Sequence, residues 1–354
     1  MIKTQNENRK NLAAIGLSLF IGLFPLWCLA HGEIIADGVP VETVTSVLEE
    51  QNIRTGAAAA LNVTPAPLSA GTNARLDFYM TEQPSGAPVL YSTLDVVQTK
   101  LMHAFGVRTD DLGGFFHIFP TPTSTPGHMV AEHTFDESGQ YKVWSQFSSG
   151  GNTRIIGHPV FNVGPDVTPR QRNISIGRNV IVGNYQVTLA HVPDLVKNRM
   201  DELTLEIRTL TGNGAILQEY LGAPLHVVAI KGDLTVVRHF HVVPTEHMDT
   251  VGETGKKLIR QAFAHGSAGD TIPVVAYIAH VDFPSAGLYK LFVRFRPADA
   301  GLAPDQALTA SFWVNVKDSV ISKTAAWWIL LSVSIVLIAL LSFAVSKFIK
   351  PKSV

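Results

Sequence analysis

The stretch Leu225–Pro244, LHVVAIKGDLTVVRHFHVVP, decides how the rest of the chain is interpreted. Two apolar runs flank Gly232-Asp233, a dipeptide typical of a two-residue hairpin turn. That turn predicts that His226 lies opposite His239. Because side chains alternate along a strand, His241 is expected on the same face as His239. The sequence therefore predicts three imidazoles on one face of one hairpin.

A second stretch, Leu101–Pro120, repeats the pattern as LMHAFGVRTDDLGGFFHIFP. A three-residue loop at Thr109–Asp111 predicts that His103 lies opposite His117, and Phe119 stands where the other stretch has its third histidine. The similarity also includes two further pairs of segments, Phe135–Lys142 with Phe283–Lys290 and Ala74–Phe78 with Glu202–Glu206. The chain is therefore expected to contain an internal duplication, with a period of 123 residues from position 103 to position 226.

Length and composition set the broad class. A chain of 354 residues with one duplication predicts two domains. Charged residues are 16% and the formal net charge is −1, so a nucleic-acid partner is not expected. The single cysteine, Cys28, lies in a segment expected to be removed. The mature chain would then have no disulfide and no thiolate ligand, which excludes a blue-copper centre.

The body of the chain has the pattern of an all-β protein. Leu76, Phe78 and Met80 alternate with polar residues, and Gly and Pro recur at short intervals. This pattern predicts two tandem immunoglobulin-like or cupredoxin-like sandwiches. The expected boundaries are a lead-in at residues 31–60, a first sandwich at 61–164 and a second at 173–317. Asp249–Asp270 is an insertion found only in the second copy.

Both ends of the chain predict contact with a membrane. Residues 1–30 have a basic start and a long apolar run, which indicates a signal peptide cleaved after Ala30; an uncleaved anchor is the alternative. Residues 325–346 are uncharged, begin with Trp327-Trp328 and precede a lysine-rich tail at 347–354. They predict a helix that crosses the lipid bilayer, and a buried core helix is the alternative. The body is then expected on the periplasmic side of a cell membrane, with the tail in the cytoplasm.

The histidines indicate metal binding. Neutral imidazole binds copper and zinc well, and an exported site without thiolates favours copper first and zinc second. The candidate ligands are His226, His239, His241, His103 and His117, together with His31 as a free amino terminus. The pairs His128-Met129 and His247-Met248 also favour copper, because thioether sulfur is a soft ligand.

A structural role for these histidines remains an open alternative. The face that carries His226 and His239 also carries Val228, Ile230 and Val237, so it has the character of a core face. A buried neutral histidine that bonds a backbone carbonyl or another histidine fits this face equally well. The sequence contains no phosphate loop, nucleophile elbow or zinc-protease helix, so no catalytic residue is predicted.

The two stretches resemble a known type of domain. Leu225-His226, Asp233-Leu234 and His239-Phe240-His241 are similar to a domain that recurs in exported bacterial proteins of the heavy-metal-associated type. This chain departs from that pattern at Phe119 and at Val242-Val243, which separate His241 from Pro244. More loosely, Ala30-His31-Gly32-Glu33 is similar to the copper-binding subunit of membrane methane and ammonia monooxygenases. Both resemblances imply metal handling, with copper in the second case.

Three function classes follow from these features. The favoured one is a membrane-anchored envelope protein that binds a metal ion for handling, delivery or sensing. The second is a structural or interaction module, an accessory subunit that contacts other membrane or periplasmic proteins. The third is a subunit of a copper-dependent redox enzyme.

Overall fold

The computed structural model describes residues 47–220, 223–240, 242–244, 276–304, 306–318, 331–332, 334–338 and 340. All of them belong to one compact unit, Val44–Val354. Several expected features lie outside the described residues: the signal peptide 1–30, His31, His241, the insertion Asp249–Asp270 and the tail 347–354.

The first repeat folds as a two-sheet sandwich. Its first outer sheet has the strand order β2-β3-β7-β6, and its first inner sheet has the order β1-β9-β8-β4-β5 with β10 also paired to β8. The elements are β1 (Leu48–Glu49), η1 (Glu50–Asn52), β2 (Gly56–Thr64), β3 (Asn73–Gln83), η2 (Tyr91–Thr93), β4 (Met102–Arg108), β5 (Phe116–Ile118), β6 (Thr121–Pro122), β7 (His128–Thr134), β8 (Gly139–Ser149), β9 (Asn152–Gly157) and β10 (Phe161–Val163). Since β2 begins at Gly56, the expected domain start at Leu61 falls inside a strand.

The second repeat folds in the same way. Its second inner sheet has the order β15-β14-β18-β19, and its second outer sheet has the order β11-β12-β13-β17-β16. The strands are β11 (Asn179–Val182), β12 (Tyr185–His191), β13 (Met200–Thr209), β14 (Leu225–Lys231), β15 (Val237–Phe240), β16 (Val242–Pro244), β17 (Ala276–Asp282), β18 (Gly287–Phe295) and β19 (Leu308–Val316). In both repeats the histidine hairpin is followed by a short strand in the other sheet, β6 or β16.

A paired tyrosine contact confirms the duplication and the immunoglobulin-like fold. The Tyr141 hydroxyl donates a hydrogen bond to the Glu137 carbonyl at 3.0 Å. The Tyr289 hydroxyl donates to the Ser285 carbonyl at 2.8 Å. A tyrosine that bonds the backbone a few residues upstream at the start of a strand is a hallmark of immunoglobulin-like sandwiches. The expected all-β class and the tandem sandwiches are therefore confirmed.

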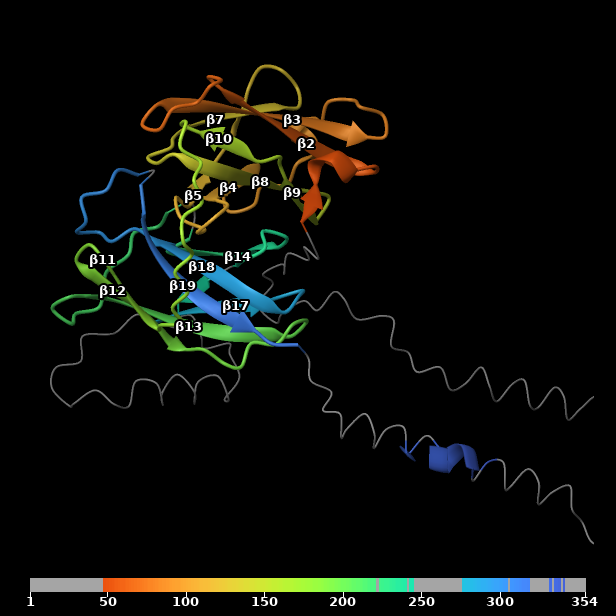
Figure 1. Ribbon diagram of the computed structural model, residues 1–354, viewed down its shortest axis with the longest axis vertical. Helices are drawn as coiled ribbons and strands as arrows, with labels where there is room; N and C mark the ends of the chain where they lie inside the picture. The colour runs from red at the N-terminus through yellow and green to blue at the C-terminus, as the bar shows by residue number, and fades with distance from the viewer. Residues whose placement is uncertain are drawn as a thin grey trace, which may run out of the picture. The chain divides into compact units, whose positions relative to one another are not determined.

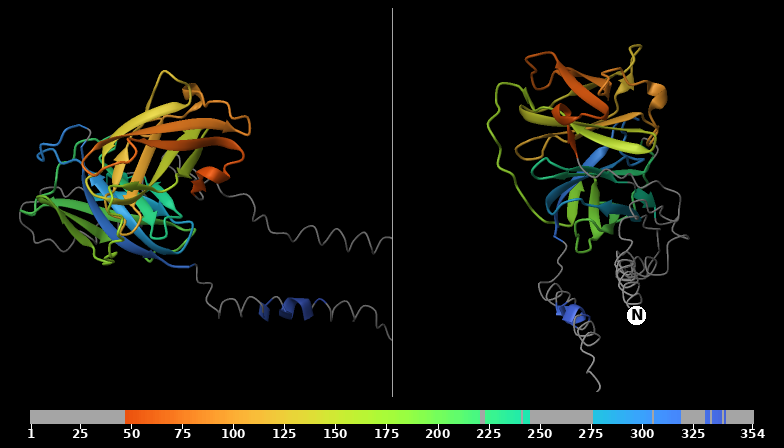
Figure 2. Two further views of the ribbon diagram at one scale, coloured as in Figure 1. Left: turned by 45° about the horizontal axis from the view of Figure 1, so that its top comes forward. Right: turned by 90° about the vertical axis from the view of Figure 1, so that its right-hand side faces the viewer.

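The four sheets are stacked in the order first outer, first inner, second inner, second outer (Figures 1 and 2). Three apolar cores fill the spaces between them. One core fills each sandwich. The third joins the two inner sheets, with Phe105 and Trp144 from the first repeat packed with Val228 and Phe292 from the second. The core-like face noted in the sequence is this interface, and burial of its apolar side chains holds the two repeats together.

The linker also ties the repeats together. The guanidinium of Arg172 donates to the carbonyls of Thr109 and Asp110 at 3.1 and 2.9 Å, in the turn of the first hairpin. It donates to the Gly232 carbonyl at 2.7 Å, in the turn of the second hairpin. One linker side chain therefore bonds the equivalent turns of both repeats.

Both histidine hairpins pair in a different register from the one expected. His239 lies opposite Val228, and His117 lies opposite Phe105. The expected pairs His226 with His239 and His103 with His117 are therefore wrong by two residues. A slip of two residues keeps each side chain on its face, so the expectation that the paired histidines share a face is confirmed. The two members of each pair are diagonal neighbours, still within reach of each other.

The turn chemistry explains the slip. In the second hairpin, the Lys231 amide donates to the Val236 carbonyl at 2.9 Å, which makes the loop longer than Gly232-Asp233. Leu234 has φ of 65°, and its first-repeat counterpart Leu112 has φ of 52°. A non-glycine residue in this left-handed region is uncommon and costly. Leu112 is fully buried in the core between the inner sheets, and this packing offsets the cost.

The expected membrane span is only partly described. Residues 331–332, 334–338 and 340 are helical. Within the described part of the chain, no helix has the length and apolar character needed to cross a bilayer.

Candidate metal centre

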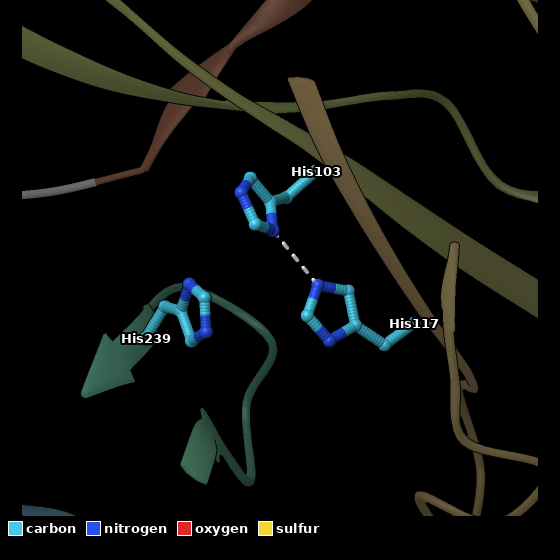
Figure 3. A group of neighbouring side chains, drawn as sticks. All are labelled: His103, His117 and His239. Atoms are coloured by element: carbon cyan, nitrogen blue, oxygen red, sulfur yellow. Dashed lines mark hydrogen bonds between the residues drawn. The ribbon is translucent and has the colours of Figure 1, made fainter. Parts of the chain in front are cut away.

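Histidines from both repeats meet where the two inner sheets face each other. His103 on β4, His117 on β5 and His239 on β15 each offer a ring nitrogen, and these atoms lie within 4.8 Å of one another. Figure 3 shows the three rings turned toward one another. His226 on β14 contacts the same group, with ring-centre distances of 5.7 Å to His239 and 5.8 Å to His117. The site is therefore one cluster shared by the two repeats.

The first pair has a defined hydrogen-bond direction. His103 Nε2 lies 3.0 Å from the Val97 carbonyl, which can only accept, so this nitrogen carries the proton. In a neutral ring, His103 Nδ1 then accepts from His117 Nε2 at 3.1 Å. His117 Nδ1 is buried and has no hydrogen-bond partner among the described residues. The first pair thus leaves one lone pair at His117 Nδ1 unused.

The second pair repeats this arrangement. His226 Nε2 lies 2.6 Å from the carbonyl of Tyr220, six residues upstream, as Val97 is upstream of His103. His226 Nδ1 then accepts from His239 Nε2 at 3.4 Å. In metal sites, a ligating histidine usually donates its other N–H to a carbonyl or carboxylate, which fixes the ring. His103 and His226 already have this anchoring bond.

Burial keeps His117 neutral. All four histidines are buried, with exposed fractions between 0% for His226 and 8% for His239. Burial, followed by the neighbouring histidines and Arg294, holds the pKa of His117 well below its usual value of 6.5. A neutral imidazole is the form that binds metal, so His117 remains able to bind in mildly acidic solution.

Arg294 adds a buried cation to the edge of the cluster. It lies opposite His226 in the sheet register, and its Nη1 donates to the His117 carbonyl at 2.7 Å. Its guanidinium lies 5.0 Å from the ring centre of Tyr220, and burial lowers its pKa. This side chain holds β5 of the first repeat against β18 of the second, although its charge opposes that of a bound cation.

The geometry fits a nitrogen-ligated ion after a small contraction. Metal–nitrogen bonds of about 2.1 Å limit two ligands of one ion to a separation of about 4.2 Å. Any two ring nitrogens that lie farther apart than this must move closer together to bind the same ion. The proton between His103 and His117 must also be released. The aromatic rings of Phe105 and Phe119 lie 4.5 Å from the His117 ring and shield the site from water. An all-imidazole site in such surroundings suits copper or zinc.

The other sequence candidates lie elsewhere. The pair His128-Met129 lies on a strand, β7, where the two side chains point to opposite faces. Met129 is fully buried in the first core, whereas His128 Nε2 lies 2.7 Å from the Asp77 carboxylate. His158 is fully buried.

A second histidine arrangement was missed by sequence reasoning. His158 Nε2 lies 3.0 Å from Ser145 Oγ, and its Nδ1 lies 2.7 Å from Glu50 Oε2. Serine, imidazole and carboxylate in this order form the arrangement of a hydrolytic triad. However, Ser145 has an exposed fraction of 0%, so no substrate can reach its hydroxyl. We therefore assign this group a structural role between η1, β8 and the end of β9.

Comparison with known families places both repeats in one family. The model of a family described as "Domain of unknown function (DUF8832)" matches residues 53–163 and 180–318. These two ranges agree with the two sandwiches. No curated protein matches the chain.

The chain also matches parts of several solved structures. InvD of Yersinia pseudotuberculosis is 13% identical with a TM-score of 0.21, over 74% of this chain and 58% of that one. Three N-terminal domains of the bacteriophage RB49 outer capsid protein Hoc are 13% identical with a TM-score of 0.17, over 74% and 59%. Invasin, a bacterial integrin-binding protein, is 12% identical with a TM-score of 0.19, over 72% and 39%. The chain spans less than two thirds of the length of each of these structures.

Proposed function

The chain belongs to the DUF8832 family, and we propose that it binds one metal ion, copper before zinc, between its two repeats. The observation that supports this proposal is the convergence of His103, His117 and His239 within 4.8 Å at the interface of the two inner sheets. Two hairpins separated by more than a hundred residues contribute to this group. The anchoring of His103 by the Val97 carbonyl adds the outer bond that metal ligands usually have.

The cellular setting completes the proposal. The apolar segment 325–346 would tether the chain to a membrane, and the signal-like residues 1–30 would place its body outside the cytoplasm. A copper site held outside the cytoplasm by a membrane-anchored chain fits handling, delivery or sensing of the ion. Because the cluster is buried and no catalytic motif accompanies it, we favour binding over catalysis.

Elemental analysis of the purified full chain tests the proposal. The protein is equilibrated with copper or zinc, desalted and analysed for bound metal. We expect a single ion per chain, with tighter retention of copper, as expected from the usual affinity order. The double variant His117→Gln with His239→Gln should retain none, because glutamine keeps a hydrogen-bonding group but offers no imidazole.

A matched control is provided by His158→Gln. This variant removes an equally buried histidine that bonds Ser145 and Glu50 outside the cluster. It should lose stability but keep the metal. Wild-type protein that retains no ion, or a double variant that retains as much as wild type, would contradict the proposal.

The second candidate function is a structural clamp for an interaction module. It is favoured by one observation: His103 and His226 each have both ring nitrogens bonded without any ion. In that case the double variant would unfold more readily than wild type, and added copper would not change the unfolding midpoint of either protein. Metal binding instead predicts that copper raises the midpoint of wild type alone.

A further inference from the structure

A pocket opens beside the histidine cluster, at the seam between the two repeats. Its volume is about 640 Å³. Six of its lining residues matter here: Arg75, Lys100, His117, Phe119, Glu132 and Tyr220. His117 belongs both to this lining and to the metal centre, so the pocket lies directly against the cluster.

Phe119 lines the pocket beside His117 and packs against two of the imidazoles. Its ring centre lies 4.5 Å from that of His117 and 5.3 Å from that of His103. It also lies 6.3 Å from the Tyr220 ring of the second repeat. A buried site needs a passage for its ion. A half-buried ring that lines the pocket and contacts two candidate ligands is the natural position for that passage.

The charges around the pocket favour an anion. Lys100 Nζ lies 5.9 Å above the Phe119 ring, and no ion pair or hydrogen bond from this ammonium is formed within the described residues. The guanidinium of Arg75, about half exposed, adds a second cation, although Asp77 lies 2.9 Å from it. Glu132 supplies the opposing charge and accepts a hydrogen bond from Asn73. The group left to pair with a ligand is therefore the Lys100 ammonium.

A strained turn connects this lysine to the metal centre. Val97 and Lys100 exchange both backbone hydrogen bonds, at 2.8 and 2.9 Å, around Gln98 and Thr99. Gln98 has φ of 44° and Thr99 has φ of 65°, and a β-branched residue in this region is a clear outlier. Such strain often occurs at ligand-binding positions. Here one turn presents the Val97 carbonyl to His103 and the Lys100 ammonium to the pocket.

We propose that the pocket binds a small carboxylate chelate of the metal ion, of net negative charge, from which the ion passes Phe119 to the histidines. This inference rests on the proposed function for its second step only. The Lys100 ammonium repels a hydrated dication but can pair with a carboxylate of the chelate. Phe119 and Tyr220 supply apolar walls for the carbon skeleton.

Binding of citrate to the full chain, without metal, tests the pocket alone. We expect saturable binding by calorimetry, weakened about threefold in Lys100→Gln because a partly exposed ion pair is lost. Lys197→Gln is the matched control, since Lys197 lies on the second sandwich and pairs with Asp318. It should bind citrate as wild type does. Absence of saturable binding, or equal affinity of the Lys100→Gln variant, would overturn the proposal.

Rates of copper uptake test the passage. Lys100→Gln should slow uptake from copper citrate and speed uptake of the hydrated ion, because the pocket loses a positive charge. Phe119→Ala should speed both by about tenfold, as expected for removal of a gating ring. Phe161→Ala is the control, because Phe161 lies on β10 of the first sandwich and does not line the pocket. This variant should leave both rates unchanged. Identical rates in all variants would overturn the passage.

These measurements separate the two proposals. A chain that binds citrate but never retains copper refutes the metal centre and leaves the anion pocket standing. A chain that retains copper but neither binds citrate nor responds to Lys100→Gln refutes the pocket and leaves the metal centre standing.

Discussion

The two repeats build their histidine pairs in the same way but surround them differently. In each, the first histidine bonds a carbonyl six residues upstream and accepts from the second, at 3.1 Å in the first repeat and 3.4 Å in the second. The residue opposite the first histidine is Gln146 in one repeat and Arg294 in the other. The hairpin therefore imposes the shared hydrogen bonds, whereas the different residues opposite the first histidine make the joint site asymmetric.

Removal of one pair at a time gives the largest expected effect. If the pairs are halves of one site, His103→Gln with His117→Gln should abolish copper retention, and so should His226→Gln with His239→Gln. The reason is that each variant leaves at most two of the three converging imidazoles, too few to hold an ion against exchange with water. Elemental analysis of the desalted variants measures this directly. Retention of half the wild-type copper by each variant would show two separate sites instead.

Truncation of the two large aromatic residues compares the contributions of the repeats to their interface. Trp144 and Phe292 occupy equivalent strand positions, both buried in the core between the inner sheets. Trp144→Ala and Phe292→Ala should each lower the free energy of unfolding by about 3–5 kcal/mol, because a cavity remains. Denaturant unfolding of the full chain measures both. A loss well below 1 kcal/mol in either variant would mean that the interface is not a core.

His133 gives the first repeat an acid sensitivity at a position where the second repeat has a valine. Burial lowers its pKa from 6.5 to about 4, whereas Val281 stands two residues before the matching phenylalanine of the second repeat. The unfolded chain binds this proton at a higher pH than the folded chain. Protonation of His133 therefore costs no stability above pH 6.5. As the pH drops toward 4, it lowers the free energy of unfolding by about 3 kcal/mol.

His133→Val should remove this part of the acid loss. Unfolding measured across that pH range should show a flatter profile in the variant than in wild type. As a control, Val281→Ala should lower stability equally at every pH, because it introduces no titrating group. An unchanged slope in His133→Val would show that other groups cause the acid sensitivity.

The two left-handed leucines should respond differently to the same change. Leu112→Gly relieves about 1 kcal/mol of backbone strain but loses the burial of a whole side chain, worth about 2–3 kcal/mol. It should therefore destabilise the protein by about 1–2 kcal/mol. Leu234 is only partly buried, so Leu234→Gly should be close to neutral. Thermal unfolding of both variants checks the difference, and equal losses would contradict it.

The smallest expected effect concerns the position of the third histidine. Phe119 stands where the second repeat has a third histidine. Phe119→His would add an imidazole 5 Å or so from the cluster and should tighten copper binding about tenfold. Competition with a copper chelator measures the change. Phe119→Tyr, which adds no nitrogen ligand, should leave affinity unchanged.

Much of the fold followed from patterns within each repeat. The duplication, the Asp-Leu turns and the alternating faces all depend on local sequence, so they could be recognised. The register could not, because a loop closed around a left-handed leucine has no sequence signature comparable to Asn-Gly. The slip of two residues changed the partners of His117 and His239 but preserved their face.

The candidate site was predicted only in halves. The apolar residues beside His226 gave the one available signal, since a core-like face on a hairpin needs a partner surface. Nothing in the sequence showed that the partner was the equivalent face of the other repeat, and this apposition is what brings His103, His117 and His239 together.

The linker arginine has a consequence for how tightly such a site can bind. Arg172 holds the two turns together, so each half-site meets the other at the effective concentration of a tethered pair rather than as a free molecule. For short tethers this is in the millimolar range. Ligands that bind weakly within each repeat can then behave as one strong chelate. If the chain were cut between Arg172 and the second sandwich, each repeat would keep its own histidines, but the two halves would be held together only by their noncovalent interface.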